Sequence, residues 1–405
     1  MRVLISGGGI AGLTLAYWLH QYHITSVVIE QANEIRRDGY AIDFLGTGYD
    51  VASRMSLIDR LAAQQIPFEG LVYVNKDGKP IARLDADLLR SITDGKYMGL
   101  MHATLGEVLY EALKETVEVR FGRSLVAIEP GPDTVAVTFN DSTSASFDLL
   151  IGADGVHSAT RALLFGPEEQ FSRYLGYTIA CYPLADRYGI GQTFQMYNEP
   201  GRLAAAYCTP QADNILTFFM YQTAEKEHIP REQRLVRLRE VFAGMGWLTE
   251  QFLSDVSPSE NVFMDAVVQT LMPCWHQGRV VLVGDACDCP TLLSGQGASL
   301  AMGGAYLLAR ALHQSDDYEQ AFRRYEQQMS TYVQKEQKSA RSFAKSFLPG
   351  TPLGLFVQQT MMKVLFRPTL RGLLRRTFGA QSLLSAQDAN AVQQATKRGR
   401  SLSEV

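Results

Sequence analysis

The sequence lacks the features that mark several large classes of protein. Its five cysteines are an odd number without C-x-x-C spacing, which argues against both a disulfide framework and a zinc site. Cys287 and Cys289 flank Asp288, but no second cluster of cysteine or histidine completes a set of four ligands, so we expect no metal. Unpaired thiols suit a reducing compartment. The five are Cys181, Cys208, Cys274, Cys287 and Cys289.

A dominant charge and a long apolar run are also missing. Lysine and arginine number 38 against 42 aspartate and glutamate, so the chain has no global electrostatic reason to bind nucleic acid. The apolar run at 356–366 is interrupted by Gln358, Gln359 and Lys363 and predicts no membrane span. The first expected strand begins at residue 2, which leaves no secretory signal before it. We expect a cytoplasmic protein that is a monomer or a weak dimer.

What is present is typical of a folded chain with more than one core. Hydrophobic residues make up 46% and charged residues 20%, the composition of a globular protein. A length of 405 residues predicts two domains, or one large α/β domain with an inserted part.

The first thirty residues carry the strongest signal. Arg2 to Ser6 predicts a buried strand, a glycine-rich run follows, and apolar residues at helical spacing continue to Leu19. Gly7, Gly9 and Gly12 match G-x-G-x-x-G, in which the first glycine allows a tight turn, the second lets the backbone approach a pyrophosphate, and the third lets helix and strand pack closely. The helix N-terminus then faces the phosphates.

A second expected strand, at 26–29, ends at Glu30, where a carboxylate can accept hydrogen bonds from ribose hydroxyls. The strand, the helix and the acid agree, so we predict a dinucleotide site rather than a glycine turn that binds nothing. Arg36 and Arg37 follow in a polar loop. Two interpretations of this pair stay open: the arginines contact the phosphate or ring edge of the cofactor, or they belong to a solvated loop.

Two more buried strands lead into a glycine and an acid. The apolar run 147–151 precedes Asp154 and Gly155, and the run 280–283 precedes Gly284 and Asp285. Ligands of α/β sheets bind at the carboxyl ends of strands, which favours a binding role for both acids. Either acid alone could instead cap a helix, and that alternative stays open.

The middle of the chain has a different pattern. From 172 to 221, short runs rich in Tyr, Phe, Thr and Ile are broken by turn residues, which predicts an inserted antiparallel sheet. A hairpin at 71–75 and 81–84 and a strand at 261–270 are also expected. Aromatic residues of the sheet are candidate walls of a substrate pocket, although alternate residues face opposite sides and at least half belong to ordinary core. The selected candidates are Tyr177, Tyr182, Phe194, Tyr207 and Phe218.

Helical patterns complete the predicted organisation. They cover 46–56, 105–114, 231–244, 247–253, 299–313 and 318–345. For the apolar run that follows, a helix packed across the inserted domain is favoured over a membrane-surface helix. The predicted units are a discontinuous nucleotide-binding domain (1–75, 100–170 and 271–345), a substrate-binding domain (76–99 and 171–270), a C-terminal helix (346–380) and a disordered tail (381–405).

With these motifs in place, the sequence resembles the FAD-dependent aromatic hydroxylases, the group A flavoprotein monooxygenases typified by p-hydroxybenzoate hydroxylase. Within that class it is most similar to the tetracycline-inactivating enzymes. The segments that carry the resemblance are 40–44, 152–161 and 278–308. The resemblance implies an α/β fold with a Rossmann-like FAD-binding domain, an inserted substrate domain with a mixed or antiparallel sheet, and C-terminal helices.

The resemblance also implies a set of FAD contacts. Glu30 and the glycine loop would hold the ADP half, Asp154 and Gly155 would serve the pyrophosphate and NAD(P)H, and Asp285 would bind the ribitol. Segment 295–297 would lie under the isoalloxazine, at the start of a helix whose dipole can stabilise the reduced ring. The full set is Gly7, Gly9, Ile10, Ala11, Gly12, Glu30, Gln31, Arg36, Arg37, Asp43, His102, Leu125, Asp154, Gly155, Arg161, Gly284, Asp285, Gly295, Gln296, Gly297 and Ala298.

Four positions depart from the family pattern. His102 stands where many relatives have Arg, Gln31 where Arg is common, Asp288 where His or Tyr is frequent, and Thr291 with Leu292 near the usual Pro. A buried Asp288 beside the flavin would repel the anionic reduced ring, so we expect this side chain to point elsewhere.

The activity implied by the resemblance is hydroxylation of an aromatic or polycyclic small molecule, with NAD(P)H and O₂ as co-substrates and a flavin C4a-hydroperoxide as the oxygen donor. Tetracycline inactivation, and with it antibiotic resistance, is one candidate. Two alternatives stay open: a flavin oxidoreductase that inserts no oxygen, and a ligand-binding flavoprotein that has lost turnover. The sequence identifies no catalytic base.

Overall fold

The glycine-rich loop begins at the end of an inner strand of a six-stranded sheet. Strand β1 (Arg2–Ser6) pairs in parallel with β2 (Thr25–Glu30) and β11 (Leu149–Gly152), and β11 pairs in parallel with β18 (Val280–Leu282). Because parallel strands end at the same edge, the glycine loop and both glycine–acid turns lie at one edge of this sheet. The strand order is β17-β18-β11-β1-β2-β7, with β7 at Glu118–Phe121 and β17 at His276–Gln277.

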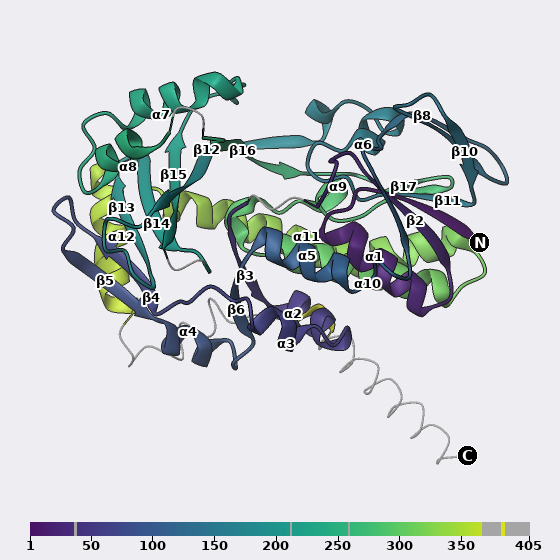
Figure 1. Ribbon diagram of the computed structural model, residues 1–405, viewed down its shortest axis with the longest axis horizontal. Helices are drawn as coiled ribbons and strands as arrows, with labels where there is room; N and C mark the ends of the chain where they lie inside the picture. Colours follow the sequence, from purple (N-terminus) through teal and green to yellow (C-terminus); the bar gives the residue numbers. More distant parts are fainter. Residues whose placement is uncertain (36–38, 211–212, 258–259, 367–381, 385–405) are drawn as a thin grey trace, which may run out of the picture.

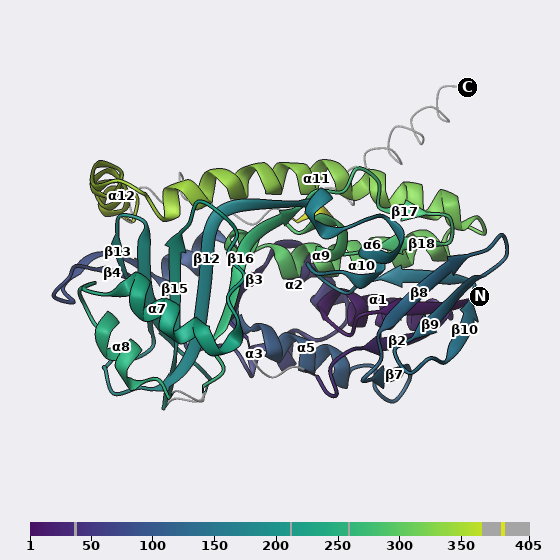
Figure 2. The same cartoon turned by 90° about the horizontal axis from the view of Figure 1, so that it is seen from above.

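The computed structural model describes residues 1–35, 39–210, 213–257, 260–366 and 382–384. Figures 1 and 2 show two halves that lie end to end, one around the six-stranded sheet and one around a seven-stranded sheet. This arrangement confirms the predicted α/β class, with an inserted sheet beside a nucleotide-binding sheet.

Both faces of the six-stranded sheet are covered, which explains why its strands are continuously apolar. Val3 and Ile5 of β1 face a core that contains several helices, whereas Leu4 faces a three-stranded sheet. That sheet consists of β8 (Leu125–Pro130), β9 (Val135–Phe139) and β10 (Ser144–Phe147). The helices of this half are α1 (Ile10–Gln21), α2 (Gly46–Arg54), α3 (Ile58–Ala62), α5 (His102–Glu111), α6 (Ala159–Leu164), α9 (Asp285–Asp288), α10 (Gly297–His313) and the first part of α11 (Tyr318–Phe347).

The expected continuous strand at 147–151 was wrong. Phe147 ends β10 and Leu149 begins β11, with Asp148 between the two strands. The chain changes sheets here because Phe147 packs in the core beneath β8–β10, while the backbone N–H of Asp148 donates to the Arg2 carbonyl at 2.9 Å and starts the pairing with β1.

The second half is a mixed sheet with the order β16-β12-β15-β14-β13-β4-β5. Its pairs are antiparallel except for β13 with β4, and both strands of the expected hairpin, β4 and β5, belong to it. One face is covered by α7 (Arg234–Phe242) and α8 (Thr249–Asp255), and the other faces the first half and the end of α11. The strands are β4 (Gly70–Val74), β5 (Pro80–Asp85), β12 (Ser172–Ala185), β13 (Thr193–Glu199), β14 (Arg202–Cys208), β15 (Asn214–Gln222) and β16 (Phe263–Thr270).

A two-stranded ribbon lies between the halves. It pairs β3 (Ala41–Leu45) with β6 (Tyr97–Met101) in antiparallel register, with Asp43 opposite Gly99. The backbone N–H of Ala41 donates to the hydroxyl of Tyr207 at 2.7 Å, which ties the ribbon to β14 of the large sheet. The remaining short elements are α4 (Ala86–Ile92), η1 (Glu168–Gln170), η2 (Arg231–Gln233) and η3 (Leu292–Ser294).

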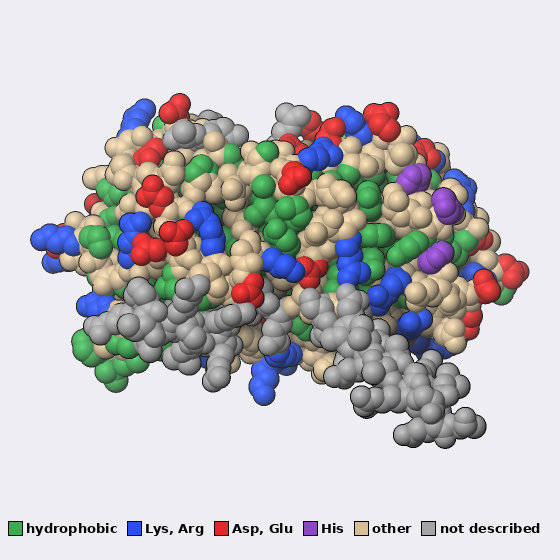
Figure 3. Space-filling view, turned by 90° about the horizontal axis from the view of Figure 1, so that it is seen from below, with side chains coloured by type: hydrophobic (Ala, Val, Ile, Leu, Met, Phe, Trp, Pro, Cys, Tyr) green, Lys and Arg blue, Asp and Glu red, His purple; other side chains and the backbone are tan. Residues whose placement is uncertain are grey.

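The last described helix, α12 (Pro352–Leu365), packs against the second half, as the favoured alternative predicted. Its buried Gln358 donates to the carbonyls of Ser346 and Phe347 at 2.8 and 2.7 Å. Apolar side chains gather on its outer face (Figure 3): Leu353, Phe356, Val357, Met361 and Val364. The rest of the predicted C-terminal helix, and the predicted tail apart from residues 382–384, lie outside the described residues. Among the helices that the structure describes, none has the length and apolar character that a bilayer crossing requires.

Candidate active site

The glycine loop is built by close backbone approaches. A Cβ placed on Gly7, whose φ is +117°, would lie 2.3 Å from the carbonyl oxygen of Ala153. A Cβ on Gly12 would lie 1.9 Å from the carbonyl oxygen of Gly7. A Cβ on Gly9 would meet no protein atom within 4 Å. The first and third glycines are therefore required by the fold itself, whereas the second borders open space in which a ligand can approach the backbone.

Glu30 holds this loop from the neighbouring strand. Its Oε2 accepts the backbone N–H of Gly8 at 2.8 Å, and its Oε1 accepts that of Ala32 at 2.9 Å. A carboxylate has further lone pairs, so these two bonds leave acceptor capacity for hydroxyl donors. Helix α1 begins beside it with Gly9 at the N-cap, no side-chain cap and no acidic residue in its first turn. The positive end of the helix dipole is thus uncompensated at the loop.

Asp154 is engaged within its own loop. Its Oδ2 accepts both the backbone N–H and the hydroxyl of Thr160, each at 2.8 Å, and its Oδ1 accepts the hydroxyl of Ser158. Ser158 in turn is the N-cap of α6 and accepts the N–H of Arg161 at 3.0 Å. The capping alternative therefore describes the geometry of this acid. Gly155, with φ of +79°, has open space where a side chain would be.

Arg161 connects two of the motif loops. Its side chain is 1% exposed, and its guanidinium donates to the carbonyl of Ala286 at 2.9 Å and to that of Val156 at 2.6 Å. Ala286 lies directly after Asp285, so this arginine fixes the turn that carries the third acid. The geometry makes Arg161 a positioning residue.

Asp285 lies where three segments meet. The preceding Gly284 has φ of +65°, and a Cβ on it would lie 2.9 Å from Cβ of Ala11 in α1. A Cβ on Gly297, the first residue of α10, would lie 3.9 Å from Oδ1 of Asp285. Burial raises the pKa of the Asp285 carboxyl, while a hydrogen bond from the Cys289 thiol opposes the shift. Helix α10 also begins without a side-chain cap, with Gln296 at its N-cap.

Asp43 of the ribbon lies beside the segment that precedes α10. Solvent reaches its side chain, and yet desolvation by surrounding protein raises the pKa of its carboxyl. The Tyr97 hydroxyl donates to Asp43 Oδ1 at 2.8 Å. A Cβ on Gly295 would lie 3.4 Å from Asp43 Oδ2, so the ribbon and the segment before α10 lie next to each other.

The segment between α9 and α10 is strained. Thr291 is 1% exposed and has φ of +119°, a conformation that β-branched residues avoid. Nearby Asp288 is 1% exposed, and its carboxyl oxygens have no hydrogen-bond partner among the described residues. Burial, followed by the charge of Asp285, holds the pKa of Asp288 well above its usual range. Asp288 also raises the pKa of Tyr325 in α11, which places its carboxyl close to that helix.

Strand alternation divides the aromatic candidates. Phe194, Tyr207 and Phe218 cluster with Tyr40 and Phe263 on the face toward the ribbon. The rings of Phe194 and Tyr207 meet edge to face, with centroids 5.1 Å apart.

Two aromatic candidates do not join that cluster. Tyr177 is on the same face but packs in the core that contains Ala344 and Leu348 at the end of α11. Tyr182 lies on the opposite face, where its hydroxyl donates to the carbonyl of Phe252 at 3.0 Å. This places Tyr182 in the core beneath α7 and α8, away from the ribbon.

The remaining predicted contacts are scattered around the loops. The backbone N–H of His102 donates to the Tyr40 carbonyl at 2.9 Å at the start of α5. Leu125 is buried in the core beneath β8–β10, Gln31 is exposed after β2, and Ala298 packs on the helical core. Arg36 and Arg37 lie outside the described residues.

Two residues of this region were not singled out from the sequence. Tyr97 enters through β6, a strand that no pattern predicted, and it is paired with Leu45 of β3. Buried Ser299 donates to the Leu45 carbonyl at 2.7 Å and fixes the start of α10 against the ribbon. Neither had a local signal, because each acts on a partner far away in the chain.

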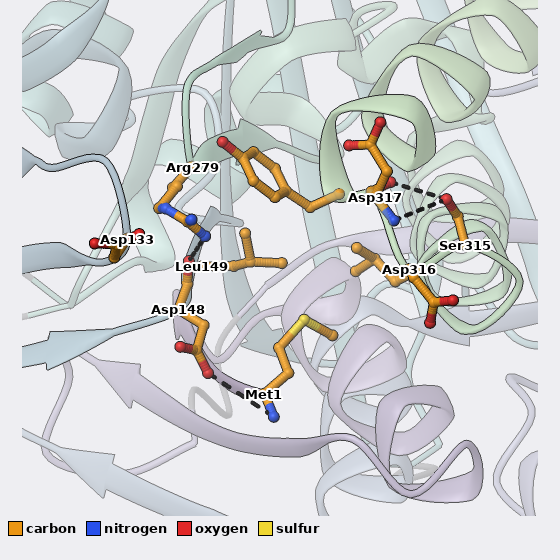
Figure 4. Close-up of a pocket in the computed structure, with 10 residues that line it drawn as sticks. Met1, Asp133, Asp148, Leu149, Arg279, Ser315, Asp316 and Asp317 are labelled. Carbon is orange, nitrogen blue, oxygen red and sulfur yellow. Dashed lines mark hydrogen bonds and ion pairs between the residues drawn. The ribbon is translucent and has the colours of Figure 1, made fainter.

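A separate surface pocket of about 510 Å³ lies at the other end of the strands (Figure 4). Met1, Asp148 and Leu149, which line it, precede or begin β1 and β11. Ligands of open α/β sheets bind at the carboxyl ends of strands, so this pocket is not the expected site.

Comparisons with known proteins agree with this geometry. A family model described as FAD binding domain matches residues 1–340. A protein named flavin-dependent monooxygenase, from an unknown prokaryotic organism, is 31% identical over 351 residues, 86% of this chain and 90% of the relative. An uncharacterised protein of Mycobacterium tuberculosis is 32% identical over 342 residues, 83% of this chain and 91% of the relative.

Solved structures give the same picture. The tetracycline destructase Tet(55) superposes with a TM-score of 0.81 at 26% identity, covering 94% of this chain and 97% of that one. Klebsiella pneumoniae HpxO, solved with FAD and uric acid, superposes with a TM-score of 0.79 at 23% identity, covering 93% and 96%. At that identity, HpxO supports the fold alone.

Proposed function

Because the chain belongs to the FAD-binding family of flavin-dependent monooxygenases, the group A aromatic hydroxylases, we propose that it uses NAD(P)H and O₂ to hydroxylate an aromatic or polycyclic small molecule. The observation that carries the proposal is the meeting of three loops, around Gly9, Asp285 and Gly297, next to Gly295, which lies beside Asp43 of the ribbon.

The donor set fits FAD. Open space at Gly9, the uncapped start of α1 and the free acceptor capacity of Glu30 suit a pyrophosphate with its adenosine. Asp285 suits the ribitol hydroxyls, and the uncapped start of α10 at Gly297 suits the isoalloxazine. When bound, the flavin supplies electron transfer from NAD(P)H to O₂ and the delivery of an oxygen atom to the substrate.

The chain's own residues orient the reactants and control charge. The N-terminal dipole of α10 favours negative charge next to it. Burial holds the pKa of Asp288 well above its usual range, which favours the uncharged form of this carboxyl. The candidate site lies between the two halves, and this position limits the access of water, which would otherwise divert the reaction.

The Asp43–Tyr97 pair and the cluster around Tyr207 supply one polar and one aromatic wall for the substrate. Such a space suits a planar ring system that carries hydrogen-bond donors. The similarity to tetracycline destructases at 25% and 26% identity makes tetracyclines the first compounds to test.

The test combines a spectrum, a turnover screen and an isotope label. Purified protein should be yellow or take up FAD, and an aromatic or polycyclic ligand should stimulate NAD(P)H oxidation several-fold. The product should contain one atom of oxygen from labelled O₂. Protein that remains colourless with added FAD would overturn the proposal.

The screen also separates the two alternatives. Ligand-stimulated NAD(P)H oxidation without labelled product identifies an oxidoreductase that inserts no oxygen. Tight ligand binding without any stimulation identifies a ligand-binding flavoprotein that has lost turnover.

A further inference from the structure

Three potential metal ligands meet at the edge of the six-stranded sheet. Cys274 and His276 flank Trp275 at the start of β17, and Glu326 reaches them from α11. The Cys274 Sγ lies 3.8 Å from His276 Nδ1 and 3.9 Å from Glu326 Oε2. The Nδ1 and Oε2 atoms are 3.0 Å apart. No local sequence pattern indicates this cluster, because Glu326 is 50 positions from His276.

The distances match the geometry of a zinc site. Zinc binds thiolate at about 2.3 Å and imidazole or carboxylate at about 2.0–2.1 Å, in tetrahedral arrangement. Donors on such a tetrahedron are about 3.6 Å apart when one is sulfur and about 3.3 Å apart when both are N or O. Each observed separation is within about 0.4 Å of these values. Small side-chain adjustments would therefore bring all three donors to bonding distance of one ion.

The surrounding structure holds two of the three ligands, His276 and Glu326, in place. Trp275 is 4% exposed, its backbone N–H donates to Glu326 Oε2 at 3.2 Å, and its carbonyl accepts the N–H of Leu282 at 2.8 Å. The His276 ring lies beside Phe322 of α11, with centroids 5.9 Å apart. Ligands held by a strand and a helix lose little freedom when a metal binds, and this favours affinity.

We propose that Cys274, His276 and Glu326 form a Zn²⁺ site with water as the fourth ligand, separate from the candidate active site. Binding replaces the thiol proton of Cys274, which passes to solvent, and no oxidation is involved. The ion joins β17 to α11 at the strand pair that leads into the Gly284–Asp285 turn. Its role is to stabilise that edge of the sheet.

The test uses the full-length protein, treated with a chelator and then titrated with Zn²⁺ against a chromophoric competitor. One Zn²⁺ should bind per chain. Co²⁺ should give the intense ligand-field bands of a tetrahedral site at wavelengths beyond the flavin absorption, together with a thiolate charge-transfer band. Zn²⁺ should also raise the melting temperature.

Matched variants decide between a site and a simple hydrogen-bonded cluster. Cys274→Ser, His276→Asn and Glu326→Gln should each lower Zn²⁺ affinity by at least about tenfold. Glu319→Gln, on the same helix and ion-paired with Arg323 at 3.3 Å, should leave affinity unchanged. If His276→Asn or Glu326→Gln fails to fold, the affinity of Cys274→Ser for Zn²⁺ is enough to decide, because Cys274 is exposed and its substitution should not disturb folding. Absence of stoichiometric binding, or equal affinity in Cys274→Ser, would overturn the proposal.

Discussion

The two halves contribute to the candidate active site in different ways. The first half presents backbone: a Cβ added to Gly7, Gly12 or Gly284 would lie only 2.3, 1.9 or 2.9 Å from a neighbouring atom. The second half presents side chains from one face of a sheet, among them Phe194, Tyr207 and Phe218. A loop whose shape requires glycine backbone tolerates almost no substitution, whereas the side chains on a sheet face can be substituted one at a time. The first half therefore identifies the family, and the second half holds most of the information about the substrate.

The largest expected effect comes from breaking the backbone-built loop. Gly12→Ala places a methyl group 1.9 Å from the Gly7 carbonyl oxygen, which should cost about 3 kcal/mol or more of folding stability and abolish FAD uptake. Gly9→Ala meets no protein atom within 4 Å and has an ordinary φ of −82°, so it should fold normally and lose only FAD affinity. Denaturant unfolding and FAD titration measure the two effects.

Gly106→Ala is the control for this pair. Gly106 lies within α5, and a Cβ there also meets no atom within 4 Å. Because alanine favours helix over glycine, this variant should gain about 0.5–1 kcal/mol and keep full FAD affinity. Equal FAD affinity in Gly9→Ala and Gly106→Ala would contradict the assignment of the open space at Gly9 to the cofactor.

An effect of intermediate size on stability and KM is expected from two variants that lie on opposite faces of the second sheet. Tyr207→Phe removes the bond from the Ala41 N–H, and Tyr182→Phe removes the bond to the Phe252 carbonyl. Each should cost about 1 kcal/mol of stability, the usual value for one hydrogen bond. Only Tyr207→Phe should raise KM for the aromatic substrate, because only Tyr207 contacts the ribbon. A KM change of equal size in both variants would remove the distinction between the faces.

The smallest effect lies at the boundary between the halves. The carboxylates of Asp265 in β16 and Glu168 raise the pKa of His157 from 6.5 to about 9. For a histidine with a raised pKa, the stabilisation is complete below pH 6.5 and is lost as pH rises through about 9. His157 is 58% exposed, so solvent screening keeps the contribution small.

Melting temperatures measured across that pH range test the interaction of His157 with Asp265 and Glu168. The wild type should lose its advantage over His157→Gln between pH 6.5 and about 9. Gln170→Asn, a change of a neutral exposed side chain in η1, serves as the control and should differ from the wild type by an amount that does not depend on pH. A constant difference between wild type and His157→Gln would mean that the ring acts through packing rather than charge.

The features predicted from the sequence are those that depend on residues close together in the chain. The strand, turn and helix around Gly7 and Gly12 are a local pattern, and so are the short strands of the second sheet, whereas the parallel pairing of β13 with β4 joins distant segments. The bond from Thr160 to Asp154 was not predicted from the sequence, because a helix cap and a ligand contact use the same residue type. The orientation of Tyr182 was equally open, since alternation defines two faces without saying which one meets the ribbon.

Contacts between distant segments were beyond sequence analysis. Arg161 reaches the Ala286 carbonyl across 125 positions, and Ser299 reaches the Leu45 carbonyl across 254. Neither side chain belongs to a pattern whose period or spacing points to its partner. The same reason hid Tyr97, which acts through the pairing of β3 with β6.

Helix α11 has a consequence for how ligands enter and leave. Its 30 residues span about 45 Å, and it packs in the first half through Phe322 and Tyr325 and in the second through Ala344 (Figure 2). A continuous helix embedded in both halves acts as a strut that resists their separation as rigid bodies. The entry and exit of ligands should therefore depend on small local displacements. The strained backbone at Thr291 is the place where such a displacement would release conformational strain energy.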